Sequence, residues 1–217
     1  MLLVCAVAAQ KLFNAPKVPA ASITVDGYLD EYAWSTGEKY KMDAANNLAR
    51  GVIDGDDDCY LNWAMRWDDA GCYLGAWFFD DFHNAPHSTY LTDANNGYND
   101  DAIEIFIDIS FDDAWNDVTD IGYRGDLGWQ LVKGFANDDI TKQYAGMWAT
   151  RNDNWYTEYW TPDDQTNKGW TNIFTTANGI DYQYEAQFTW DGEIMRNNGT
   201  PALGHEMALD LYVDDND

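Results

Sequence analysis

Short apolar runs bounded by Gly, Asn and Asp recur along most of the chain, and helical periodicity is scarce. Runs of this length with turn-forming residues at both ends are typical of β-strands. The pattern predicts strands at 58–66, 72–79, 102–109, 127–135, 143–149, 181–190 and 206–213. Loops are expected where Asp, Asn and Gly gather, at 91–101, 110–126, 136–142 and 151–168.

The most regular alternation of apolar and polar positions lies in the run 102–108. Because side chains alternate between the faces of a strand, Ile103, Ile105 and Ile107 are expected on one face. Glu104 is expected on the other. The run is therefore predicted to be a core strand with one apolar face.

A hairpin is predicted from the segments 58–66 and 72–79, because the turn-forming residues 68–71 lie between them. Cys59 and Cys72 belong to these two strands. In a secreted chain they are candidates for a disulfide. The register of the hairpin argues against the bridge, since Cys59 lies far from the turn and Cys72 close to it, and the pairing stays open.

Many strands without βαβ alternation predict an all-β fold, an antiparallel β-sandwich of jelly-roll or immunoglobulin-like type. No linker divides the chain, so one domain is expected over 22–217. The sequence stops at Asp217, directly after an apparent strand. A fold ending there would leave a sheet edge unfinished, so we expect that the C-terminus is truncated.

The first residues, 1–10, are apolar and end in small residues. They resemble the second half of a signal peptide and are interpreted as its remnant. This predicts a secreted protein, extracellular or periplasmic. No apolar run reaches the roughly 18 residues of a membrane-spanning helix.

The composition fits a folded domain, because hydrophobic residues make up 46% of the chain. The formal net charge is -26, which repels nucleic acid and anionic membranes, so neither is expected as a partner. Aromatic residues reach 16%, with 11 Trp and 14 Tyr. These rings can fill a core, or they can stack on the apolar C–H faces of sugars.

Signals for catalysis are weak. Carboxylates are so abundant that some pair will always have the spacing of a glycosidase, and that pair then carries no information. His83, His87 and His205 lack the spacing of a zinc site. The sequence has no nucleophile elbow, P-loop or dinucleotide motif. We therefore expect no enzymatic activity in this domain, although it can be part of a larger polysaccharide-degrading enzyme.

Acidic runs suggest bound calcium. Asp54 and Asp56 belong to one run, and Asp80 and Asp81 directly follow a predicted strand. Calcium prefers carboxylate and carbonyl oxygens, often from loops. Solvated acidic turns are the alternative for any single run. A structural calcium ion held by these four residues is the prediction.

A ligand site is predicted where the strand 102–108 begins. Tyr98 precedes the strand, and Glu104 lies on its polar face. A ring and a carboxylate so placed can stack on a sugar and accept hydrogen bonds from its hydroxyls. The alternative is that Tyr98 packs on its loop and Glu104 faces solvent.

Several segments together resemble the family 9 carbohydrate-binding modules, which are attached to xylanases and related enzymes. The matching segments are Ile23 to Trp34, Trp67-Asp68-Asp69 with Cys72-Tyr73-Leu74 and Asp80-Asp81, Asn99 to Asp108, Tyr184-Glu185-Ala186 with Trp190, and Asp210 to Asp217. The run Asn99 to Asp108 is the closest match. The resemblance covers about residues 22–217, and the order of the motifs makes it fairly specific.

The resemblance implies a β-sandwich with bound calcium that holds the ends of glucan or xylan chains between two aromatic rings. It implies that Tyr98 is the first stacking ring and that Glu104 binds sugar hydroxyls. Gln130 matches a position beside an Arg of the family, but Val132 stands where that Arg would be. The expected ligand is plant cell-wall polysaccharide or its oligosaccharides.

The second stacking ring would lie beyond the end of this sequence. Trp129, Trp148 and Trp155 are candidates to replace it, and Trp129 is included in the predicted binding site. Other functions that the same broad fold allows are a structural or adhesive role and heme binding. A glycosidase is a weaker alternative. A heme would need axial His or Met ligands, and the sequence pairs no Met with a His.

Overall fold

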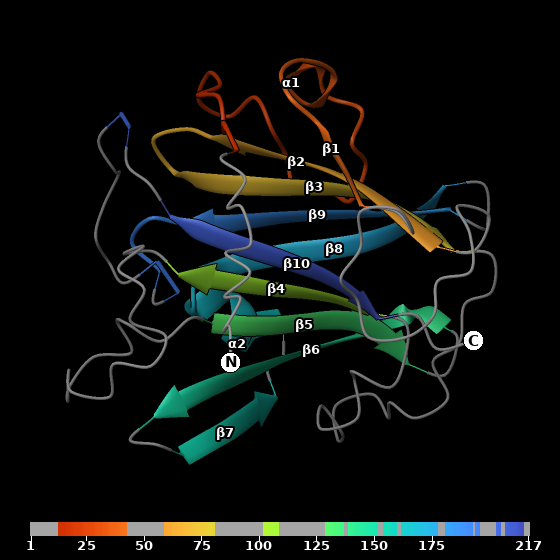
Figure 1. Ribbon diagram of the computed structural model, residues 1–217, viewed down its shortest axis with the longest axis vertical. Helices are drawn as coiled ribbons and strands as arrows, with labels where there is room; N and C mark the ends of the chain where they lie inside the picture. Colours follow the sequence, from red (N-terminus) through yellow and green to blue (C-terminus); the bar gives the residue numbers. More distant parts are fainter. Residues whose placement is uncertain are drawn as a thin grey trace, which may run out of the picture.

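The computed structural model consists of two five-stranded antiparallel sheets with few helices (Figure 1). Every strand pair within these sheets is antiparallel. The predicted antiparallel β-sandwich is therefore confirmed. The structure describes residues 13–42, 59–80, 102–108, 129–136, 139–151, 154–159, 162–177, 181–192, 194–195, 203–204 and 207–214.

The first sheet, sheet A, has the strand order β1-β2-β3-β9-β8. Its strands are β1 (Tyr40–Met42), β2 (Cys59–Trp67), β3 (Gly71–Asp80), β9 (Asp181–Thr189) and β8 (Trp170–Ala177). The second, sheet B, has the order β10-β4-β5-β6-β7. Its strands are β10 (Ala208–Asp214), β4 (Ala102–Asp108), β5 (Trp129–Ala136), β6 (Asp139–Arg151) and β7 (Asn154–Tyr159). Two short helices are α1 (Tyr32–Ser35) and α2 (Pro162–Asn167).

The main hydrophobic core lies between the two sheets. Ile103, Ile105 and Ile107 of β4 are each at most 1% exposed, and they belong to one cluster with residues of sheet A. The alternation predicted for 102–108 is therefore confirmed. The sheet A members of this cluster include Leu61, Trp63, Leu74, Ala76, Tyr184 and Phe188.

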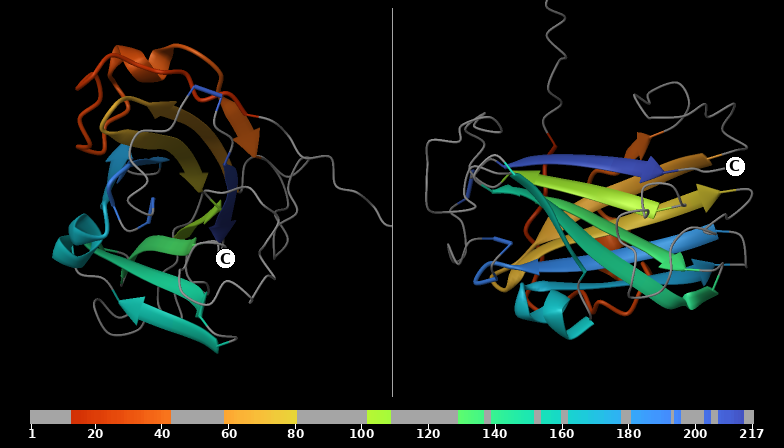
Figure 2. Two further views of the ribbon diagram at one scale, coloured as in Figure 1. Left: turned by 90° about the vertical axis from the view of Figure 1, so that its left-hand side faces the viewer. Right: turned by 90° about the horizontal axis from the view of Figure 1, so that it is seen from below.

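Residues 18–34 of the N-terminal segment cross the outer face of sheet A, opposite the main core (Figure 2). Trp34 of α1 is fully buried there and packs with Ala64 and Tyr73, the outward residues of β2 and β3. Gly75 makes room for this indole, because a Cβ at that position would lie 2.9 Å from Trp34 Cζ3. A second, smaller core thus attaches the N-terminal segment to the sheet.

The sequence pattern missed β1, β7 and β8, and each of these strands lies at the edge of its sheet. Edge strands have one side open to solvent, so their apolar alternation is weak. The predicted loop 136–142 is wrong in part, since β6 begins at Asp139. The predicted loop 151–168 contains β7 and α2. The expected loops 91–101 and 110–126 lie outside the described residues.

The predicted hairpin is present, with Trp67 paired to Cys72 next to the turn and Cys59 paired to Asp80 at the open end. At about 3.3 Å per residue, the backbones at Cys59 and Cys72 are separated by roughly 26 Å along the strands. Cys72 is a free, buried cysteine, and burial raises the pKa of its thiol. The bridge between these two residues is therefore excluded. None of the described helices has the length and hydrophobicity needed to cross a membrane.

Candidate functional site

Glu104 lies in the middle of β4, on the face of sheet B that points away from the main core. It pairs with Tyr212 of β10 on one side and Val132 of β5 on the other. Its side chain alternates with those of Ile103 and Ile105, and it is only 6% exposed. Glu104 therefore does not face open solvent, which the alternative interpretation of this residue required.

The strand register brings a second predicted residue to this region. Gln130 pairs with Phe106, which is two residues from Glu104 on the same strand. Gln130 and Glu104 therefore occupy diagonal positions on neighbouring strands, with about 7–8 Å between their Cα atoms. Their positions have the same parity, which means that they belong to the same set of alternate residues in the sheet. Trp129 pairs with the core residue Ile107, so it occupies a position of the opposite parity. The register thus separates Trp129 from the other two.

The register also locates the two other tryptophans considered above. Trp148 of β6 pairs directly with Gln130. Trp155 of β7 pairs with Thr150, two residues along β6 from Trp148. The positions of Glu104, Gln130, Trp148 and Trp155 therefore form a band of one parity across four neighbouring strands, called here the sheet B band. Tyr98 lies outside the described residues.

Most of the predicted metal ligands also lie outside the described residues, namely Asp54, Asp56 and Asp81. Asp80 ends β3 and pairs with Cys59, the residue that follows the acidic run 54–58 in sequence. In the part of the chain that the structure describes, no group of three or more His, Cys, Asp or Glu could hold a metal ion. The calcium site stays a prediction.

The first sequence motif, which contains Asp26-Gly27 and Trp34, meets Glu185 of β9. Trp34 Nε1–H donates to Glu185 Oε1 at 3.0 Å, and the backbone N–H groups of Asp26 and Gly27 donate to Oε2, also at 3.0 Å. Glu185 is fully buried. Burial raises its pKa to about 7, although the three donors favour the ionised carboxylate. The motif therefore forms a buried polar attachment of the N-terminal segment.

Gly27 is required in this attachment for two reasons. Its φ of +86° lies in the left-handed region, which side chains rarely adopt. A Cβ there would also lie 2.4 Å from Thr175 Cγ2 of β8. The Asp-Gly pair of the motif thus has a structural explanation.

The second motif forms the turn of the β2–β3 hairpin. Asp68 Oδ1 accepts the backbone N–H groups of Ala70 and Gly71 at 2.8 and 3.2 Å. Asp68 Oδ2 accepts the hydroxyl of Tyr73 at 3.1 Å and the N–H of Ala21 at 3.3 Å. This carboxylate joins the turn to the N-terminal segment, so the motif is structural as well.

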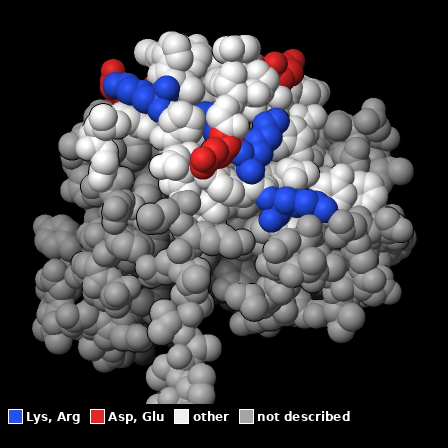
Figure 3. Space-filling model, turned by 45° about the horizontal axis from the view of Figure 1, so that its top comes forward, with Lys and Arg blue, Asp and Glu red and all other residues white. Residues whose placement is uncertain are grey.

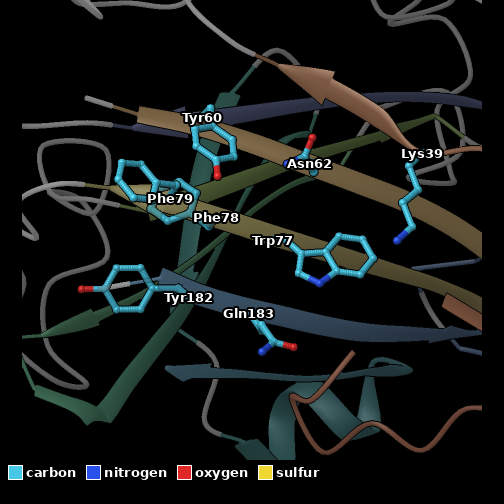
Figure 4. Close-up of a pocket in the computed structure, with 8 residues that line it drawn as sticks. All are labelled: Lys39, Tyr60, Asn62, Trp77, Phe78, Phe79, Tyr182 and Gln183. Carbon is cyan, nitrogen blue, oxygen red and sulfur yellow. The ribbon is translucent and has the colours of Figure 1, made fainter. Parts of the chain in front are cut away.

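A groove that sequence reasoning missed lies on the outer face of sheet A, beside the part that residues 18–34 cover (Figure 4). Its volume is about 340 Å³. Tyr60 and Phe79 stand at one end as a stacked cross-strand pair, with ring centroids 5.1 Å apart. Trp77 stands at the other end, beneath the ammonium group of Lys39. The signal in the sequence was the aromatic residues at outward-facing positions of β2 and β3.

The comparisons with known proteins show the fold. No protein-family model matches the chain, and no curated protein matches it. A solved structure of a family 9 carbohydrate binding module from Caldicellulosiruptor kristjanssonii, in complex with cellotriose, superimposes with a TM-score of 0.51. It is 17% identical and covers 92% of this chain and 76% of its own.

A second structure of a family 9 module from the same organism, in complex with glucose, has a TM-score of 0.48 at 17% identity and covers 91% of this chain and 76% of its own. The first of these structures confirms, at the level of the fold, the resemblance found in the sequence. The chain is an antiparallel β-sandwich with the fold of a family 9 carbohydrate-binding module.

Proposed function

We propose that this chain is a non-catalytic carbohydrate-binding domain that takes oligosaccharides or chain ends of glucan and xylan. It would be secreted and would hold an attached enzyme or a cell surface to plant cell-wall polysaccharide. The observation that carries the proposal is the sheet B band, in which a carboxylate, an amide and tryptophans share one parity. The shared fold with a module whose structure contains cellotriose supports it.

The band offers the two kinds of contact that a sugar needs. Carboxylate and amide oxygens accept hydrogen bonds from hydroxyl groups, and indole faces stack on the apolar faces of sugar rings. Trp148 would supply the second stacking ring, which the resemblance puts beyond the end of the sequence. Because the sugar ligand is uncharged, binding should depend little on salt.

Replacing Trp148 by Ala is expected to weaken binding of cello- or xylo-oligosaccharides at least tenfold, which corresponds to about 1.4 kcal/mol. Tyr98→Ala should weaken binding in the same way, and Glu104→Gln should weaken it through the lost acceptor. Titration calorimetry measures each affinity. Tyr32→Ala is the control, because Tyr32 is 82% exposed on α1 and belongs to the N-terminal segment.

Trp129→Ala provides a second comparison. Its position pairs with Ile107 of the core, so its loss should lower stability more than affinity. The proposal fails if none of the sugars gives a binding signal with the wild-type chain. The site assignment alone fails if Trp148→Ala binds as tightly as Tyr32→Ala.

We also propose a structural calcium ion near the open end of the β2–β3 hairpin. The pairing of Cys59 with Asp80 supports it, because the acidic run 54–58 adjoins one residue and Asp81 the other. Addition of EDTA is expected to lower the melting temperature, and calcium should restore it more effectively than magnesium. Asp80→Asn combined with Asp54→Asn should abolish the response. An unchanged melting temperature in EDTA would contradict the proposal.

A further inference from the structure

The groove on the outer face of sheet A lies on the opposite sheet from the sheet B band. Its central row runs across the strands from Asn62 through Trp77 to Gln183, which are paired in the register. The ring pair of Tyr60 and Phe79 forms the neighbouring row. All five side chains are half-buried, so the groove is lined by groups that a ligand can reach.

The groove presents oriented hydrogen-bond donors. Gln183 Oε1 accepts the backbone N–H of Leu29 at 2.8 Å, which fixes the orientation of the amide. Gln183 lines the groove, and its NH₂ group is on the other branch of the amide, where it can donate to a ligand. Asn62 supplies a second amide beside Trp77 (Figure 4). Rings that alternate with amides are suited to a sugar chain.

Each end of the groove carries a lysine, Lys39 at the Trp77 end and Lys41 at the Tyr60 end. Lys39 Nζ lies 4.4 Å from the centroid of the Trp77 ring, and Lys41 Nζ lies 5.1 Å from that of Tyr60. Both lysines are exposed, and no carboxylate in the described part of the chain forms an ion pair with Lys39. Figure 3 shows basic side chains, with acidic ones beside some of them, on the described part of this face. In a protein with a net charge of -26 and only 12 basic residues, this placement is unusual.

We propose that this groove is a second saccharide site, which binds a largely neutral glycan chain through one uronate carboxylate. The carboxylate would bind Lys39, and the neighbouring sugars would contact Trp77, Tyr60 and the NH₂ group of Gln183. The acidic runs 54–58 and 80–81 adjoin the other end of the groove in sequence, so the carboxylate belongs at the Trp77 end. The overall negative charge repels densely charged polyanions, so a chain with scattered uronates fits better than nucleic acid.

The test compares two xylo-oligosaccharides of equal length, one neutral and one with a single glucuronate substituent. Calorimetry with the Trp148→Ala chain removes the contribution of the sheet B band. That chain is expected to bind the substituted ligand at least about tenfold more tightly than the neutral one, and raising the salt concentration should reduce the difference. If the proposed function is wrong, the wild-type chain will not bind the neutral ligand. If only the second site is wrong, the wild-type chain will bind the neutral ligand, but the Trp148→Ala chain will show no preference for the substituted one.

Lys39→Gln is expected to abolish the preference for the uronate ligand without changing the melting temperature, because Lys39 is exposed. Lys17→Gln is the matched control, since Lys17 is also an exposed lysine over a Trp ring but pairs with Asp69. Equal affinity for both ligands, or equal effects of the two lysine variants, would overturn the proposal. The proposal would also be overturned if the chain bound a short single-stranded oligonucleotide and Lys39→Gln weakened that binding as much as it weakened binding of the uronate ligand.

Discussion

A Glu185→Gln chain is expected to lose much of the pH dependence of stability that the wild-type chain shows between about pH 4.5 and 7. Burial raises the pKa of Glu185 to about 7 from 4.5, so the folded chain binds this proton more tightly than the unfolded chain does. The resulting stabilisation is complete below pH 4.5 and is lost as the pH rises through 7. A shift of this size corresponds to about 3 kcal/mol.

The amide in Glu185→Gln has no proton to release, and it fits the site poorly. One carboxylate oxygen now accepts the indole N–H of Trp34, and the other accepts the N–H groups of Asp26 and Gly27. The NH₂ group of Gln must face one of these sets of donors, which costs about 1–3 kcal/mol for a buried unpaired group. The variant should therefore be clearly less stable than the wild type at pH 5, with a smaller difference at pH 8.

Urea unfolding at several pH values, followed by tryptophan fluorescence, measures this difference. Asp30→Asn is the control, because Asp30 is an exposed carboxylate on the same segment, and its curve should run parallel to that of the wild type. The comparison between variants also cancels the general repulsion within an acidic chain. A wild-type and Glu185→Gln pair whose stabilities change in parallel with pH would show that Glu185 is ionised throughout this range.

The sequence predicted the central strands and the edge strand β10, and it missed the edge strands β1, β7 and β8. Ile103, Ile105 and Ile107 alternate regularly because their strand is paired on both sides and covers a core. In β8, by contrast, Trp170 and Phe174 are separated by Thr171, Asn172 and Ile173, and one side of the strand has no neighbour in sheet A. A pattern read along the chain does not contain the partner that makes such a strand stable.

The sequence also indicated some residues of the candidate sites and missed others. Tyr98 and Glu104 are close in sequence, so a local pattern could suggest them together. The groove joins Lys39, Trp77 and Gln183, which are far apart in the chain. Trp77 and Gln183 meet through the register of β3 with β9, and Lys39 meets Trp77 over its ring. Likewise, Glu185 matched a motif, but its role depends on Asp26 and Trp34 at the other end of the chain.

Arg66 is the buried cation of the same attachment, and replacing it by Met is expected to lower the free energy of unfolding by about 1–3 kcal/mol for each buried carbonyl left without a donor. The side chain is fully buried on β2, and the burial lowers the pKa of its guanidinium. It donates to the carbonyl of Ala33 at 2.8 Å, to that of Glu38 at 3.4 Å, and to that of Thr36. Met would leave these carbonyls without their donor.

These carbonyls hold the segment that leads into Lys39, so Arg66 is also expected to position the cation of the sheet A groove. Arg66→Lys keeps the charge but not the planar fork of donors, and it should lose about half as much stability as Arg66→Met. Urea unfolding measures the stability of both variants. In the folded Arg66→Lys chain, the preference for the uronate ligand should fall while neutral ligands bind unchanged, because the sheet B band is on the other sheet. A Met variant as stable as the wild type would show that the N-terminal segment is held by Trp34 and Glu185 without Arg66.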